Sequence, residues 1–206
     1  MLQGSVLFAA SPSKQRRYDQ GPLKYSEFRQ NSKDSMPGHA QTIAQVMYQY
    51  KTFIKQTARD RFEVRLTSLE TYSVFLRSQS WWNHPESEEL LDHEQGHFDI
   101  AEISARRLEL SFRETLKNGK PIRGTGKSKR AANYDLEQKL QKVFDLANEQ
   151  SLDENRQYDQ QTRHGARHGQ QSEFRRIQKL TLEKLAKELG GSQKAKARKS
   201  KSGTKQ

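Results

Sequence analysis

Alternation of apolar and polar side chains marks the first half of the chain. An apolar residue stands at every second position in residues 39–53 (Val46, Tyr48, Tyr50), residues 62–66 (Phe62, Val64, Leu66) and residues 72–76 (Tyr72, Val74, Leu76). A period of two is typical of strands with one buried face, so these stretches predict antiparallel strands. Residues 40–47 are also compatible with a helix.

Helical spacing replaces this alternation after residue 83. One long helix is predicted to begin near Asn83 and Pro85 and to end at Lys117, where Asn118 and Gly119 favour a stop. Apolar residues at helical spacing predict a second helix over residues 133–149 and a third over residues 171–189. We therefore expect an α+β fold, in which a small antiparallel sheet packs on the long helix with two further helices.

Polar ends flank this pattern. Residues 1–22 lack periodicity and are expected to form a flexible N-terminal arm, followed by one domain over residues 23–189 and a disordered basic tail over residues 190–206. The tail contains six Lys or Arg residues and no acid, which is half of the formal net charge of +12. Such a tail attracts polyanions without reading a sequence, so an acidic polymer is a candidate partner.

Composition narrows the chemistry further. The chain has no cysteine, so any metal must be bound by His, Asp or Glu. No apolar run approaches the roughly 18 residues of a membrane span, and no complete signal-peptide pattern is evident at the N-terminus. Outside the tail, basic residues are interspersed with acidic ones, so specific nucleic-acid binding is not expected; it would need a basic face with aromatic side chains in the folded part.

The strongest chemical signal is an HExxH motif within the long predicted helix. His93 and His97 are four residues apart, about 40° around a helix, so both imidazoles can reach one Zn²⁺ ion. Glu94 lies beside the first histidine, where its carboxylate can hold a metal-bound water. This is the arrangement of a zinc hydrolase, and the cofactor that it predicts is zinc.

A catalytic zinc usually has three protein ligands, so a third must come from elsewhere. Asp99 and Glu102 lie about 240° and 180° from His93 around the helix, which points both away from the shared metal and leaves them to orient ligands or tie the helix to the sheet. The segment 158–169 contains glycine and histidine and is predicted to be irregular, as functional loops often are. Its His164 and His168 are the candidates that spacing suggests.

The residues around the motif resemble a known family. Ser80-Trp81 and residues 90–102 (LLDHEQGHFDIAE), with Tyr158-Asp159, Thr162, His164-Gly165 and Gln171 downstream, resemble a bacterial family of predicted secreted zinc-dependent proteases that is catalogued as a domain of unknown function. The resemblance implies a zincin-like domain, secreted or periplasmic, with His93 and His97 as zinc ligands and Glu94 as the base. It makes His164 the leading third ligand, with His168 and Glu102 as alternatives.

The resulting hypothesis is a zinc-dependent peptidase that acts on a peptide or protein substrate. Glu94 would take the proton of the zinc-activated water, and Tyr158 or His168 would stabilise the oxyanion. The alternative is a non-catalytic zincin-like binding protein, anchored to an acidic polymer by its basic tail. A nucleic-acid-associated protein ranks third.

Overall fold

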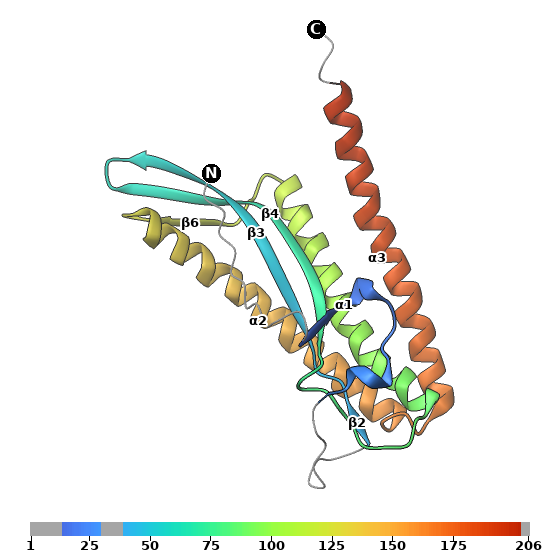
Figure 1. Ribbon diagram of the computed structural model, residues 1–206. Helices are drawn as coiled ribbons and strands as arrows, with labels where there is room; N and C mark the ends of the chain where they lie inside the picture. Colours follow the sequence, from blue (N-terminus) through green and yellow to red (C-terminus); the bar gives the residue numbers. More distant parts are fainter. Residues whose placement is uncertain (1–13, 30–38, 203–206) are drawn as a thin grey trace.

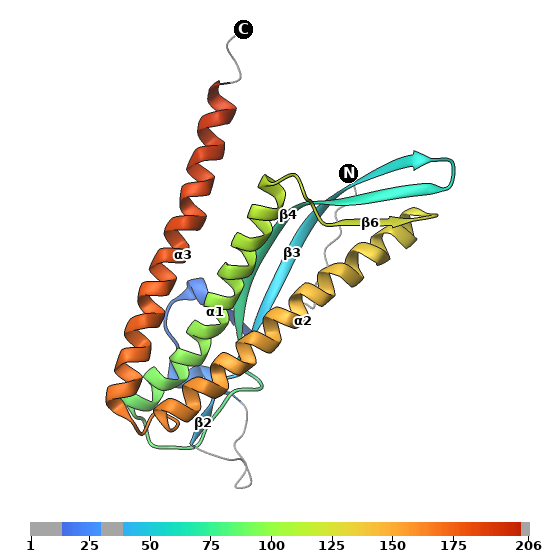
Figure 2. The ribbon, with the colours of Figure 1, turned by 180° about the vertical axis from the view of Figure 1, so that it is seen from behind.

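The protein is built in layers around a twisted antiparallel sheet. A computed structural model describes residues 14–29 and 39–202. Helices α1 (Glu88–Lys117) and α2 (Lys129–Thr162) cover one face of the sheet, and α3 (His168–Ser202) packs on α1 (Figure 1). The view from behind shows α2 running along the sheet on one side of α1 and α3 on the other (Figure 2). The predicted α+β class, with an antiparallel sheet and three helices, is confirmed.

Strand β4 (Arg61–Leu76) is the centre of the main sheet. Strand β3 (Ala44–Ala58) pairs with it on one side, whereas β1 (Gln15–Arg17) and β6 (Arg123–Gly126) share its other side. Two short strands, β2 (Ala40–Gln41) and β5 (Trp81–Trp82), form a separate pair before α1. A strand within residues 39–53 is thus confirmed from Ala44 onward, and the alternative helix over residues 40–47 is wrong.

A β-bulge explains why the apolar alternation predicts two separate strands, over residues 62–66 and 72–76, where the structure has the single strand β4. Lys51 pairs with Ser68 but Thr52 pairs with Leu66, so β4 carries one extra residue at this point. The extra residue shifts the inward-facing set by one, because successive side chains point to opposite faces. Thr71 consequently faces α1 and its hydroxyl donates to the Ala105 carbonyl (2.6 Å). The predicted strand over Tyr72, Val74 and Leu76 is confirmed as the second part of β4, and Val74 and Leu76 are buried on the face opposite to Thr71.

The N-terminal segment is part of the fold from residue 14 onward. Strand β1 pairs with the end of β4, and the Arg16 guanidinium is buried in an ion pair with Glu27. The same Glu27 carboxylate accepts a hydrogen bond from Arg77 (2.8 Å). The predicted flexible arm is therefore wrong for residues 14–22, while residues 1–13 lie outside the described part of the chain.

The helices follow the predicted order but not all of the predicted lengths. Helix α1 begins after Ser87, whose hydroxyl accepts from the Leu90 amide, and ends at Lys117 as expected. Helix α2 continues to Thr162, and α3 continues to Ser202, into the segment expected to be disordered from residue 190. Close packing of α2 on β6 depends on Gly124, where a Cβ atom would lie 2.1 Å from the Ala132 carbonyl oxygen.

Candidate metal centre

Helix α1 places the HExxH side chains in the interior of the protein. The rings of His93 and His97 have centroids 4.9 Å apart. His93 and Glu94 are 2% and 3% exposed, and the Glu94 Oε2 atom is buried without a hydrogen-bond partner. A buried carboxylate oxygen that lacks a donor is costly, so its position beside two imidazoles indicates a site for a ligand.

Asp159 on α2 completes this cluster, and sequence reasoning did not identify it as a ligand. Its Oδ1 atom lies 3.1 Å from His93 Nε2 and 3.0 Å from His97 Nε2. Burial would raise the pKa of Asp159, but the hydrogen bonds from both histidines outweigh burial and hold that pKa well below its ordinary value. Asp159 is therefore an ionised carboxylate aimed at both imidazoles.

The segment that carries Asp159 is helical, which corrects the prediction of an irregular stretch from residue 158. The chain leaves the helix only after Thr162, where Arg163, His164 and Gly165 have φ values of 49°, 51° and 87°. This left-handed turn brings His164 Nδ1 to 3.4 Å from Asp159 Oδ1, although the His164 side chain is 79% exposed. His164 is thus at the edge of the cluster and Asp159 at its centre.

The donor atoms fit a zinc ion in kind and in spacing. Ligand atoms of His93, Asp159 and His164 lie within 4.8 Å of one another, and the same holds for His93, Glu94 and His97. Donors at about 2.0–2.1 Å from a tetrahedral zinc stand roughly 3.3 Å apart, close to the separations between Asp159 and the two imidazoles. Two of the donor pairs in the cluster therefore already have a spacing that suits a metal. Imidazole and carboxylate donors also suit other divalent transition metals, so the donor set alone does not select zinc.

Hydrogen bonds from α2 orient the His97 ring. Asn155 donates its amide to the Ser151 carbonyl (2.7 Å), which leaves its oxygen to accept from His97 Nδ1 (2.6 Å). Burial would lower the pKa of His97, but the hydrogen bond to Asp159 and the charges of Glu94 and Asp159 raise it. Metal binding would displace the Nε2 proton while Asn155 keeps the ring in place.

Three further buried atoms around His93 have no hydrogen-bond partner among the described residues: His93 Nδ1, the Tyr158 hydroxyl oxygen, and Gln171 Oε1 at the start of α3. His93 and Gln171 both approach the backbone of Gly165, where a Cβ atom would lie 3.2 Å from Gln171 Oε1 and 3.4 Å from His93 Cβ. Only glycine combines this close approach with a φ of 87° at little cost.

Tyr158 packs on the side of His93 that faces the protein interior, and it does not line the groove that opens over the cluster. Its side chain is fully buried, its ring stacks on His93 (centroids 4.8 Å apart), and Phe174 of α3 packs against it edge-on. Burial raises the pKa of Tyr158 far above its ordinary value, so the phenol stays neutral. The expected role of Tyr158 in oxyanion stabilisation is therefore not supported. Its position fits support of the His93 ring instead.

Glu102 and His168, the alternative third ligands, are not brought to the cluster. Glu102 turns to the sheet, where its Oε2 accepts from the Ser73 hydroxyl (2.8 Å), and it pairs with Arg106. His168 is exposed at the first residue of α3 and is not among the residues that line the groove. The expected role of His168 in oxyanion stabilisation is therefore also unsupported. Glu102 ties the helix to the sheet, which is one of the two roles that the sequence predicted for it.

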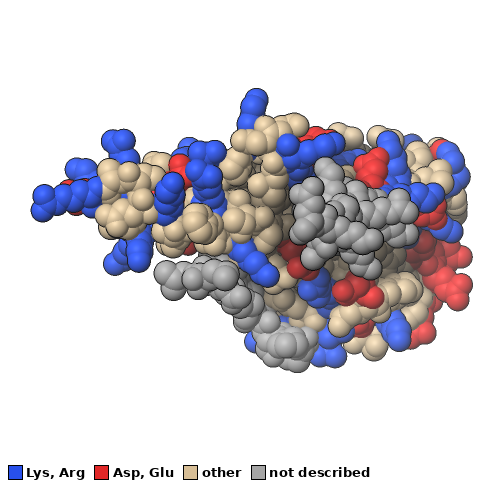
Figure 3. All heavy atoms as spheres, turned by 90° about the horizontal axis from the view of Figure 1, so that it is seen from above, with Lys and Arg blue, Asp and Glu red and all other residues tan. Residues whose placement is uncertain are grey.

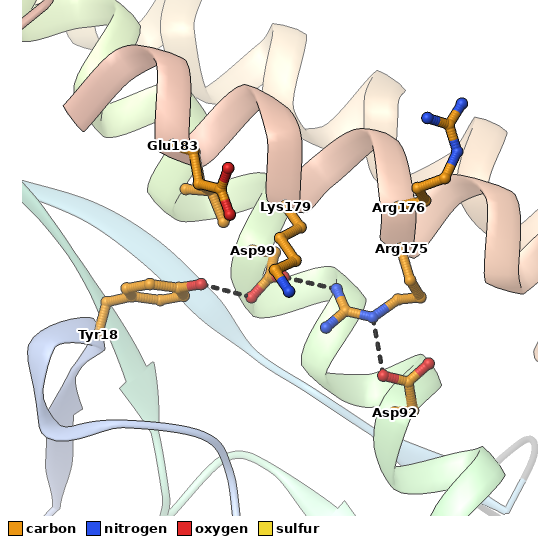
Figure 4. Close-up of a pocket in the computed structure, with 8 residues that line it drawn as sticks. Tyr18, Asp92, Asp99, Arg175, Arg176, Lys179 and Glu183 are labelled. Atoms are coloured by element: carbon orange, nitrogen blue, oxygen red, sulfur yellow. Dashed lines mark hydrogen bonds and ion pairs between the residues drawn. The ribbon is translucent and has the colours of Figure 1, made fainter. Parts of the chain in front are cut away.

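Asp99 anchors the opposite side of α1. Figure 4 shows its carboxylate between Tyr18 and Arg175. The Tyr18 hydroxyl donates to it (2.8 Å), and so does the Arg175 guanidinium (2.5 Å), which also bonds to Asp92 (2.9 Å). These bonds join the N-terminal segment and α3 to the helix that carries the motif. Asp99 is thus structural, with no contact to the ligand cluster among the described residues.

A groove opens over the cluster. It has a volume of about 1110 Å³ and is bounded by residues 39–48, which include the start of β3, by α1 and by α2. His93, Glu94, His97 and Asp159 form part of its wall, and the apolar residues Ile43, Leu90 and Phe144 form another part. The groove is large enough to admit several residues of an extended chain.

Comparisons with known proteins give no match, so any assignment of function has to rest on the geometry of the site. No protein-family model, curated protein or solved structure matches the chain. Within residues 14–29 and 39–202, no helix is long and apolar enough to cross a membrane.

Proposed function

We propose that this protein is a zinc-dependent peptidase with a zincin-like fold. The observation that carries the proposal is the convergence of His93 Nε2 and His97 Nε2 on Asp159 Oδ1, at 3.1 and 3.0 Å, beside a buried Glu94 in the wall of a large groove. His93, His97 and Asp159 would hold the metal, and His164 is close enough to His93 and Asp159 to join them. Asp159 thus replaces His164 as the leading third ligand.

The chemistry follows from the residues around the groove. Zinc held by these residues would lower the pKa of a coordinated water and polarise a carbonyl oxygen. Glu94 would take a proton from a water held beside the two imidazoles and pass it to the leaving amine. Asn155 and Tyr158 keep the two imidazole rings in position, and the groove holds the peptide on either side of the bond that is cleaved.

The test combines metal content with cleavage. Protein purified without a histidine tag is expected to contain about one zinc per chain and to cleave members of an unbiased peptide library, detected by mass spectrometry. Glu94→Gln should abolish cleavage and retain zinc, because the carboxamide cannot accept the proton. Glu114→Gln, at an exposed position of the same helix, is the matched control and should leave both unchanged.

Two results would contradict the proposal. One is a zinc-loaded protein that cleaves no peptide in the library, which would favour the non-catalytic binding protein. The other is cleavage that survives Glu94→Gln.

A further inference from the structure

Positive charge gathers at the end of the β3–β4 hairpin. Residues 51–65 form the outer part of this hairpin, and residues 120–130 contain β6 and the turn into α2 beside it. Together these two segments, the basic hairpin end, contain ten Lys or Arg residues and two acidic residues, a net charge of +8. In Figure 3 this end projects from the body on the left, and its charged side chains are almost all Lys and Arg. The expectation that basic residues outside the tail are interspersed with acids is wrong here, because the fold brings two basic segments together.

Most of these cations form no ion pair with the described residues. Arg65 and Arg123 share the carboxylate of Glu63. The other eight form no ion pair within the part of the chain that the structure describes. Crowding like charges on one projection is unfavourable, and a polyanion would relieve that repulsion.

An exposed aromatic ring lies among the cations. Phe53 is 54% exposed on β3, although it lies in a sheet whose other face is covered by α2. Lys51 and Lys55 are two residues away on the same strand, so their side chains share its face. Across the sheet, Phe53 pairs with Arg65, and Arg65 pairs with Arg123. Among the described residues, the face of the sheet opposite to α2 therefore presents one exposed aromatic ring with four cations around it, two of which share Glu63.

We propose that the basic hairpin end binds single-stranded nucleic acid without sequence preference. The cations would contact phosphates, and an unpaired base would stack on Phe53, since aromatic rings stack on all four bases. A duplex has no free base to offer. An anionic lipid surface normally takes up several apolar side chains, and Phe53 is the only exposed large hydrophobic residue of the described hairpin.

This inference does not depend on the proposed peptidase activity. The metal ligand Asp159 lies near the C-terminal end of α2, whereas the basic hairpin end includes its N-terminus, so Glu94→Gln should not alter nucleic-acid binding. The two proposals can therefore fail separately.

The experiment is a fluorescence-anisotropy titration of the full chain with a labelled oligothymidine of roughly 16 nucleotides, the upper end of typical site sizes. Lys55, Arg59 and Arg61 are replaced together by Ala, and the control replaces Lys142, Lys184 and Lys187, which are exposed on α2 and α3. The hairpin variant should reduce the slope of log affinity against log salt by about 2, since each lost phosphate contact contributes about 0.7. The control should change the slope little.

Phe53 separates stacking from charge. Phe53→Leu should weaken binding roughly tenfold, whereas Phe53→Tyr should retain it, because tyrosine keeps the aromatic face. Circular dichroism before titration checks that each variant is folded, as expected for an exposed position. Duplex DNA of the same length should bind more weakly and should not respond to Phe53→Leu.

Three outcomes would overturn the inference. The first is no binding of the oligonucleotide at low salt. The second is equal loss in the hairpin variant and the control, which would indicate diffuse attraction. The third is binding only to vesicles that contain anionic phosphatidylglycerol, which would assign the surface to a membrane.

Discussion

Gly96 sits at the point where the HExxH helix meets Tyr158, and replacing it tests how the site is built. A Cβ atom at position 96 would lie 2.4, 2.6 and 2.8 Å from the Oη, Cζ and Cε1 atoms of Tyr158. Tyr158 cannot move aside freely, because it is fully buried between His93 and Phe174. Gly96→Ala should therefore force both the helix and the ring to shift.

The magnitude follows from two opposing terms. Overpacking a close-packed interior costs about 1–3 kcal/mol, while replacing a helical glycine by alanine returns up to about 1 kcal/mol. The expected net loss in the free energy of unfolding is about 1–2 kcal/mol, or about 2–8 °C in Tm for a chain of this size. Zinc affinity should fall as well, because Tyr158 supports the His93 ring.

A matched control and a double variant isolate the contact. Gly190 is also helical, but no atom lies within 4 Å of a Cβ placed there, so Gly190→Ala should leave stability unchanged or raise it. Combining Gly96→Ala with Tyr158→Leu should cost less than the sum of the single changes, by about 1 kcal/mol. Urea unfolding of the four proteins measures this. If Gly96→Ala behaves like Gly190→Ala, and if its effect adds to that of Tyr158→Leu, the packing argument is refuted.

Two further predictions concern the metal ligands and a buried tyrosine. Asp159→Asn should lower zinc affinity at least tenfold in a competition titration with a chelating dye, and by more than His164→Ala, because Asp159 contacts both imidazoles. Asp145→Asn, at an exposed position of the same helix, is the control. A larger loss of affinity for His164→Ala would restore His164 as the third ligand. Burial, followed by the charge and hydrogen bond of Glu137, raises the pKa of Tyr50 to about 12. The neutral phenol is thus favoured in the folded state, so its stabilisation is present below about pH 10 and is lost as the pH rises to about 12. Tyr50→Phe should make the alkaline fall in stability shallower in urea unfolding at several pH values, and an unchanged slope would contradict this reasoning.

The parts of the fold that depend on local patterns were predictable. Alternation identified β3, and helical spacing with the stop at Asn118 and Gly119 identified the end of α1. The spacing of His93, Glu94 and His97 predicted their shared face, because a helix sets those angles by itself. Longer-range features were missed. The bulge in β4 opposite Lys51 changes which residues of that strand face inward, and β1 pairs with the end of β4, which is far away in the sequence.

The site shows the same division. The sequence by itself determined the two histidines, the adjacent glutamate and the helix that presents them. Only the tertiary structure decided that Asp159 and Asn155 meet those imidazoles, since α2 is polar at these positions and apolar spacing could not extend it past residue 149. Polar residues at a spacing of four, Ser151, Asn155 and Asp159, were the available signal. Likewise, the basic hairpin end exists only because the sheet places β6 beside the hairpin, and no local pattern specifies which distant segments will become neighbours.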